Sequence, residues 1–242
     1  MSNFNNKTSF FSSASSRASS TTFDPALRDY MVKVYNLMSV ALVISGAVAF
    51  LIANSPALLN VIYGTPLKWV IMFAPLGFVL YINARINSIS AQKAKTYLWI
   101  FSALMGASIS WILVAYTASS VARVFFITSA VFGSMSLYGY STKKDLTSLG
   151  SFLFMGLIGI IIASIVNIFL HSSALHFAIS FIGVLIFVGL TAYDTQAIKR
   201  QFYALGGAGE TANKAAILGA LRLYLDFVNL FMMLIQFAGD RK

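Results

Sequence analysis

Two of the seven acidic residues lie in long apolar stretches, where a carboxylate is a candidate for chemistry. Asp194 follows an apolar run over 175–193, and Asp226 lies inside another over 217–237. The other five acids lie in predicted tails or loops: Asp24, Asp29, Asp145, Glu210 and Asp240. An ionised carboxylate is costly in an apolar environment unless it is paired or hydrated. Asp194 and Asp226 are therefore the candidate functional residues.

The two aspartates belong to one half of a membrane if the run before Asp194 ends on the side where the run around Asp226 begins. Two carboxyl groups within a hydrogen bond of each other in a low dielectric do not both ionise easily, so the pair can share a proton near physiological pH. The pair is thus predicted to form a pH-sensitive latch. The alternative for Asp194 is an acid at a helix end in the headgroup region, close to Lys199 and Arg200.

Polar residues continue along the last apolar run. Arg222 precedes Asp226 by one helical turn, so an ion pair between them is the alternative to a shared proton. Asn229 and Gln236 extend roughly the same face, and Asn167 in an earlier run could join them or form a simple interhelical hydrogen bond. Such a stripe in lipid should face protein or a water path.

The composition places these residues in a membrane. The chain has 242 residues, of which 58% are apolar and 10% charged, and its mean hydropathy is +0.80. Too few polar residues remain to cover a water-soluble core. The absence of Cys and the presence of only two His argue against disulfides and zinc sites, and no cofactor is expected. The net charge of +10 comes from Lys and Arg between apolar runs, which favours lipid contact over nucleic acid.

Seven apolar runs predict an all-α protein with seven transmembrane helices. The runs cover 35–53, 67–82, 97–116, 121–138, 149–170, 175–193 and 217–237. The second run is short and contains Pro75, so six spans and a re-entrant hairpin are the alternative. Small residues around Gly106 and at Gly159 predict close helix packing.

The distribution of cations predicts the orientation. With seven spans, twelve Lys and Arg lie on the N-terminal side and four on the other, which places the N-terminus in the cytoplasm and the C-terminus outside. Residues 1–24 are expected to form a disordered Ser-rich cytoplasmic tail, although a transit peptide is an alternative. Residues 25–242 form the membrane domain, and Asp24-Pro25 predicts the start of a short interfacial helix.

Several segments carry a resemblance to a known family. They are Tyr193-Asp194-Thr195-Gln196 with Ile198-Lys199, the run from Leu223 to Phe231 around Asp226, Thr142-Lys143-Lys144-Asp145-Leu146, and Val34-Tyr35-Asn36-Leu37-Met38. In this order and spacing they resemble the Bax inhibitor-1 family over roughly residues 26–238.

The resemblance implies seven membrane helices with the last one central, wrapped by the other six. It also implies a pH-sensing pair at Asp194 and Asp226 that controls a calcium leak, with Ca²⁺ passing near both residues. Arg85 is the nearest candidate for a latch arginine found in some members. Arg222 departs from the family, in which that position is commonly uncharged. A bacterial inner membrane is the preferred location, with an organellar membrane as the alternative.

Two other functions fit the same features. A Tyr-Asp in the sixth run and an Asp in the seventh are similar to intramembrane aspartyl proteases, but Leu-Tyr-Leu precedes Asp226 where that family has a Gly-x-Gly approach. We therefore expect no enzyme. The second function is that of a membrane regulator that binds another membrane protein, such as an AAA protease or a cell-death factor. Its tail would then be the site of contact.

Overall fold

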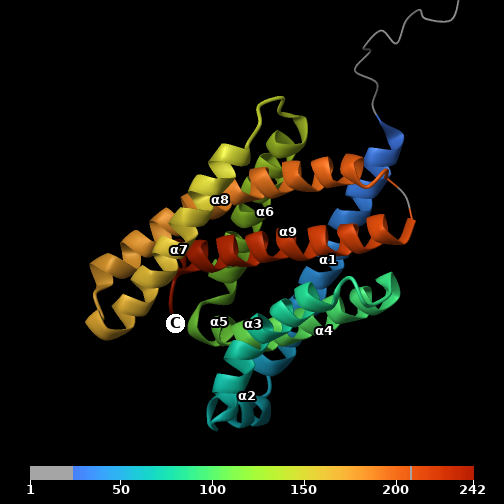
Figure 1. The fold of residues 1–242 in the computed structure, drawn as a ribbon. Coiled ribbons are helices and arrows are strands. Elements are labelled where there is room, and N and C mark those ends of the chain that lie inside the picture. The colour runs from blue at the N-terminus through green and yellow to red at the C-terminus, as the bar shows by residue number, and fades with distance from the viewer. Residues whose placement is uncertain (1–23, 208) are drawn as a thin grey trace, which may run out of the picture.

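The computed structural model describes residues 24–207 and 209–242, and within them the chain is helical throughout (Figure 1). The predicted tail lies outside the described residues. The helices are α1 (Pro25–Ala53), α2 (Pro56–Tyr63), α3 (Leu67–Arg85), α4 (Ala91–Ile109), α5 (Trp111–Ala115), α6 (Ala118–Ser141), α7 (Thr147–Leu170), α8 (Ser173–Ala204) and α9 (Gly209–Ala238).

Seven of these segments are long and apolar enough to cross a membrane, as predicted. They are α1, α3, α4 with α5, α6, α7, α8 and α9. The six-span alternative is wrong, because α3 runs unbroken through Pro75. Proline is tolerated within membrane helices, where neighbouring groups satisfy the freed backbone carbonyl. Large apolar side chains such as Phe126 and Phe169 lie exposed on the outside, where lipid would cover them.

Several helices extend beyond the apolar runs that predicted them. The helix predicted to begin at Asp24-Pro25 does begin there, and it continues without a break into the first span as the first part of α1. Asp24 caps α1 as expected, with its carboxylate accepting hydrogen bonds from the backbone N–H groups of Ala26 and Leu27. Hydropathy detects the part of a helix that crosses lipid, whereas the helix itself continues into the polar region.

The last helix is the centre of the bundle. α9 packs against α1, α4, α6 and α8, while α3 lies on α4 and α7 lies on α8 (Figure 1). Within its most apolar window, α9 is 56% buried, against 11–39% for the other spans. The central last helix implied by the resemblance is confirmed, although α3 and α7 form an outer layer and are not among its main neighbours.

Glycines mark the closest helix contacts. A Cβ on Gly106 of α4 would collide with the Ser45 backbone of α1, and one on Gly139 of α6 would collide with the Ala192 backbone of α8. The predicted contact at Gly106 is therefore confirmed. The prediction for Gly159 is wrong, because a Cβ there would meet no atom within 4 Å.

The two ends of α9 are held differently. Its C-terminal end is fixed by the chain that follows: Thr117 N–H donates to Asp240 O at 3.0 Å, and Lys242 N–H donates to Ala115 O at 3.0 Å. Its N-terminal end follows a turn with positive φ at Gly206 (71°), Gly207 (75°) and Gly209 (89°), a conformation that glycine adopts without steric cost. That end lies beside the start of α1, where Lys33 Nζ donates to Asn213 Oδ1.

Candidate functional site

The two candidate aspartates meet at the centre of the bundle. Asp194 lies on α8 and Asp226 on α9, and each is only 6% exposed. α8 and α9 pack along each other, and the two carboxyl groups lie within side-chain hydrogen-bonding reach of one another. The packing thus brings together the two residues that the sequence placed in one half of the membrane.

One oxygen of this pair lacks a partner. Asp226 Oδ2 is fully buried and accepts no hydrogen bond from any group in the described part of the chain. An ionised carboxylate has acceptors only, so two ionised aspartates have no donor between them. A single proton on either carboxyl group would supply that donor.

Arg222 lies near the aspartates without forming an ion pair. Its side chain is exposed on α9, and it is a cationic neighbour of both Asp194 and Asp226 and of the buried Tyr30 hydroxyl. Among residues 24–207 and 209–242, ion pairs within 4.0 Å join Arg123 to Asp240, Arg200 to Asp145 and Lys214 to Glu210. The direct pairing of Arg222 with Asp226 is therefore not made in this structure.

The two cations considered for Asp194 also bind elsewhere. Arg200 Nη1 donates to Asp145 Oδ1 at 2.6 Å, and Lys199 Nζ donates to Tyr140 O at 2.8 Å. Asp194 is thus buried against α9 rather than held at the surface by these residues.

The other predicted residues are distributed over the bundle. Arg85 lies exposed at the end of α3 near the Tyr97 ring of α4, and α3 packs on α2 and α4. Asn167 lies at the end of α7, where its Oδ1 accepts a hydrogen bond from the Ser172 backbone in the turn to α8. The structure does not bring either residue to the aspartates.

Asn229 and Gln236 remain on the central helix. Both are half-buried on α9, on the C-terminal side of Asp226. They place polar atoms between Asp226 and the end of the helix that is fixed to the α5–α6 turn.

A buried polar contact next to the pair was not predicted from the sequence. Tyr224, two residues before Asp226, is completely buried, and its hydroxyl lies 2.6 Å from Ser45 Oγ of α1. Ser45 Oγ also lies 2.7 Å from Ser102 O of α4. This contact ties α9 to α1 and α4, and a Tyr and a Ser within apolar runs were its only sequence signal.

Two of the segments that carried the family resemblance, residues 142–146 and residues 193–199, are joined by hydrogen bonds. Gln196, two residues after Asp194, accepts from Leu146 N–H at 2.9 Å and donates through Nε2 to Lys144 O at 2.7 Å. Arg200 Nη1 adds a contact of 2.7 Å to Thr147 Oγ1. The loop before α7 is thereby fixed to α8 within one turn of Asp194.

Asp145 in that loop is held in its ionised form. Hydrogen bonds from the Thr147 hydroxyl and backbone N–H, and the guanidinium of Arg200, lower the pKa of Asp145 below its ordinary value. Because this carboxyl is fully exposed, its effect on the free energy of unfolding is small.

The aspartates have no third ligand suited to a fixed metal ion. Within the described part of the chain, no three His, Asp or Glu side chains gather into a group. Two carboxylates on adjoining helices are fewer protein ligands than a fixed cation site normally has.

The fold and this site define a polytopic α-helical membrane protein with a buried aspartate pair between its two longest described helices. The family model described as "Inhibitor of apoptosis-promoting Bax1" matches residues 27–242. The chain therefore belongs to the Bax inhibitor-1 family, as its sequence motifs indicated.

Bacterial relatives match almost the whole chain. An uncharacterised protein of Rickettsia prowazekii is 49% identical over 221 residues, which are 91% of this chain and 93% of that protein. An uncharacterised protein of Caulobacter vibrioides is 46% identical over 228 residues, or 90% and 91% of the two chains. The inner membrane protein YbhL of Escherichia coli is 44% identical over 219 residues, or 89% and 93%. None of these three is named for an enzymatic activity.

Proposed function

We propose that this protein is a pH-sensitive cation leak whose gate is the pair Asp194 and Asp226, with calcium as the conducted ion. The observation that carries the proposal is the meeting of these two buried carboxyl groups, with Asp226 Oδ2 left without a donor. Ionisable groups inside a membrane protein are costly and mark ion or proton paths.

The gate would work through the proton that the pair shares. With one proton present, the carboxyl groups hydrogen-bond and hold α8 against α9, which keeps the path closed. When the proton leaves, two negative charges face each other in a low dielectric and repel, so the helices separate. The exposed carboxylates then attract cations. Arg222, which is near both residues without pairing, would limit how strongly the opened pair repels.

The protein would lie in a bacterial inner membrane with its N-terminus in the cytoplasm. The ends of α1 and α9 that meet through Lys33 and Asn213 belong to the side that carries most Lys and Arg residues. The location of YbhL in the inner membrane of E. coli supports the same compartment. Asp194 would then lie near the cytoplasmic end of α8, ten residues from Ala204, and Asp226 would lie near the middle of α9, 12 residues from Ala238 at the outer end.

The decisive experiment measures calcium flux into proteoliposomes between about pH 5.5 and about pH 8.5, the range in which a shared proton exchanges. We expect the wild type to conduct more at high pH, and Asp226→Asn and Asp194→Asn each to lose the pH response. Asp145→Asn is the matched control, since it removes a carboxylate from the same side that stays ionised in this range. A full pH response in both pair variants contradicts the gate.

A second candidate, a regulator of another membrane protein, is supported by the family description, which names the inhibition of an apoptosis-promoting protein. The partner would be a cell-death factor or a membrane protease. Absence of flux in the wild type favours this function. Deleting residues 1–23 then tests it, because loss of partner binding by an intact membrane domain assigns the contact to the tail.

A further inference from the structure

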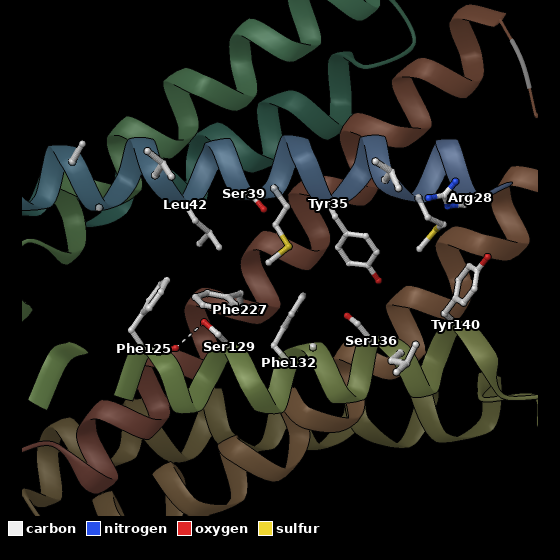
Figure 2. Close-up of a pocket in the computed structure, with 18 residues that line it drawn as sticks. Arg28, Tyr35, Ser39, Leu42, Phe125, Ser129, Phe132, Ser136, Tyr140 and Phe227 are labelled. Carbon is white, nitrogen blue, oxygen red and sulfur yellow. Dashed lines mark hydrogen bonds between the residues drawn. The ribbon is translucent and has the colours of Figure 1, made fainter. Parts of the chain in front are cut away.

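A large groove lies between α1 and α6 on one side of the bundle (Figure 2). It encloses about 940 Å³, and side chains of both helices point into it, with Phe227 of α9 at its base. α1 and α6 each pack against α8 and α9, but α1 and α6 do not pack closely against each other, and the groove lies between them. Its volume lies at the upper end of the range for small-molecule sites.

The groove is open because glycines, which have no side chain, line its walls. A Cβ on Gly46 of α1 or on Gly133 of α6 would meet no atom within 4 Å. Both glycines line the groove, whereas Gly106 and Gly139 lie in direct helix contacts. The small residues here therefore leave a space that protein does not fill.

The middle of this space is apolar. Leu42 of α1 and Phe125 and Phe132 of α6 face it, and the Phe227 ring packs edge-on against both phenylalanines with ring centroids 5.5 Å apart. Such a surface in a bilayer suits a hydrocarbon chain rather than water.

One end of the groove is basic and polar. Arg28 lies there near the start of α1, and Tyr140 of α6 and Tyr35, about two turns further along α1, also line this part of the groove (Figure 2). Arg28 makes no ion pair within 4.0 Å in residues 24–207 and 209–242. The ammonium group of Lys199 lies 5.2 Å from the Tyr140 ring centroid and adds positive charge at this end. Guanidinium and tyrosine hydroxyl groups at a membrane surface bind phosphate.

We propose that the α1–α6 groove binds one anionic phospholipid, with its acyl chain over Phe132 and Phe227 and its phosphate at Arg28. Charge complementarity decides between lipids, because the basic end favours a headgroup with net negative charge over a zwitterionic one. This proposal does not rest on the proposed leak, since it is argued from Arg28 and the apolar groove walls alone.

The test is native mass spectrometry of the full chain in detergent with added phosphatidylglycerol or phosphatidylcholine. We expect one phosphatidylglycerol to be retained, about fivefold more strongly than phosphatidylcholine, as one arginine at a membrane surface provides. Arg28→Gln should reduce this preference, and Lys143→Gln, which removes an exposed cation outside the groove, should not. Equal retention of the two lipids by the wild type overturns the proposal.

Filling the groove tests the acyl chain separately. Gly133→Leu and Gly46→Leu should each lower retention about fivefold, because a Cβ at either position meets no atom within 4 Å and the leucine side chain then extends into the groove. Gly159→Leu on α7 is the matched control, since its Cβ also meets nothing but it lies outside the groove. Equal losses in all three variants, with unchanged helical content, also overturn the proposal.

Discussion

The two faces of α6 use small residues in opposite ways. Toward α8, Gly139 allows the backbones to touch at Ala192, and Ser136 Oγ lies 3.2 Å from Thr195 Oγ1 beside Asp194. Toward α1, Gly133 faces open space about 1.7 turns before Gly139. Glycine therefore indicates close helix packing only where a neighbouring helix is present, and the sequence around the two positions does not distinguish them.

Among the variants that test this difference between the two faces of α6, Gly139→Leu should have the largest effect on the free energy of unfolding. The leucine side chain would collide with the Ala192 backbone of α8, which cannot move without shifting the helix that carries Asp194. We expect a loss of about 3 kcal/mol in the free energy of unfolding. The thermal unfolding temperature in detergent measures it, and Gly133→Leu on the same helix is the control that should remain near wild type.

Ser45→Ala should have the next largest effect, because it breaks the buried contact between α1 and α9. It leaves the Tyr224 hydroxyl buried without its partner, at a cost of about 2 kcal/mol. Tyr224→Phe should cost less, about 1 kcal/mol, because Ser45 Oγ keeps the carbonyl oxygens of Ala41 and Ser102. Denaturant unfolding of both variants gives the order, and the reverse order would contradict this hydrogen-bond arrangement.

Asp145→Asn should have the smallest effect on the pH dependence of stability. It tests whether pH sensitivity extends from the buried aspartate pair to the loop before α7. Since its pKa is lowered, Asp145 contributes stability above its ordinary pKa and loses it only as the pH falls through the lowered value. Between about pH 5.5 and about pH 8.5 the residue stays ionised, so stability in the wild type should not change through this group. Thermal unfolding across that range checks this, and a change in pH dependence in the variant would contradict it.

Much of the fold could be predicted because the membrane reduces the choice of structures. The apolar runs predicted the seven spans. Asp194 and Asp226 could be predicted as the candidate site because they are acids at the end of, or inside, apolar runs. The limits of α8 and α9 could not be predicted, since their ends leave the apolar region while remaining helical. The positions of Arg85 and Asn167 depended on which helices are neighbours. Hydropathy does not report this, and α3 and α7 proved to lie in the outer layer.

The last helix is held through backbone hydrogen bonds at its C-terminal end and through exposed side-chain hydrogen bonds at its N-terminal end, and this difference has a mechanical consequence. The segment after Ala238 fixes one end of α9 to the α5–α6 turn, while glycines precede the other end. At 1.5 Å per residue, Asp226 lies about 18 Å and Gly209 about 44 Å from that anchored end. If α9 tilts as a rigid rod, Asp226 moves less than half as far as Gly209. The aspartate pair thus lies nearer to the fixed end than the loop between α8 and α9 does, and a given tilt of α9 displaces the pair less than the loop.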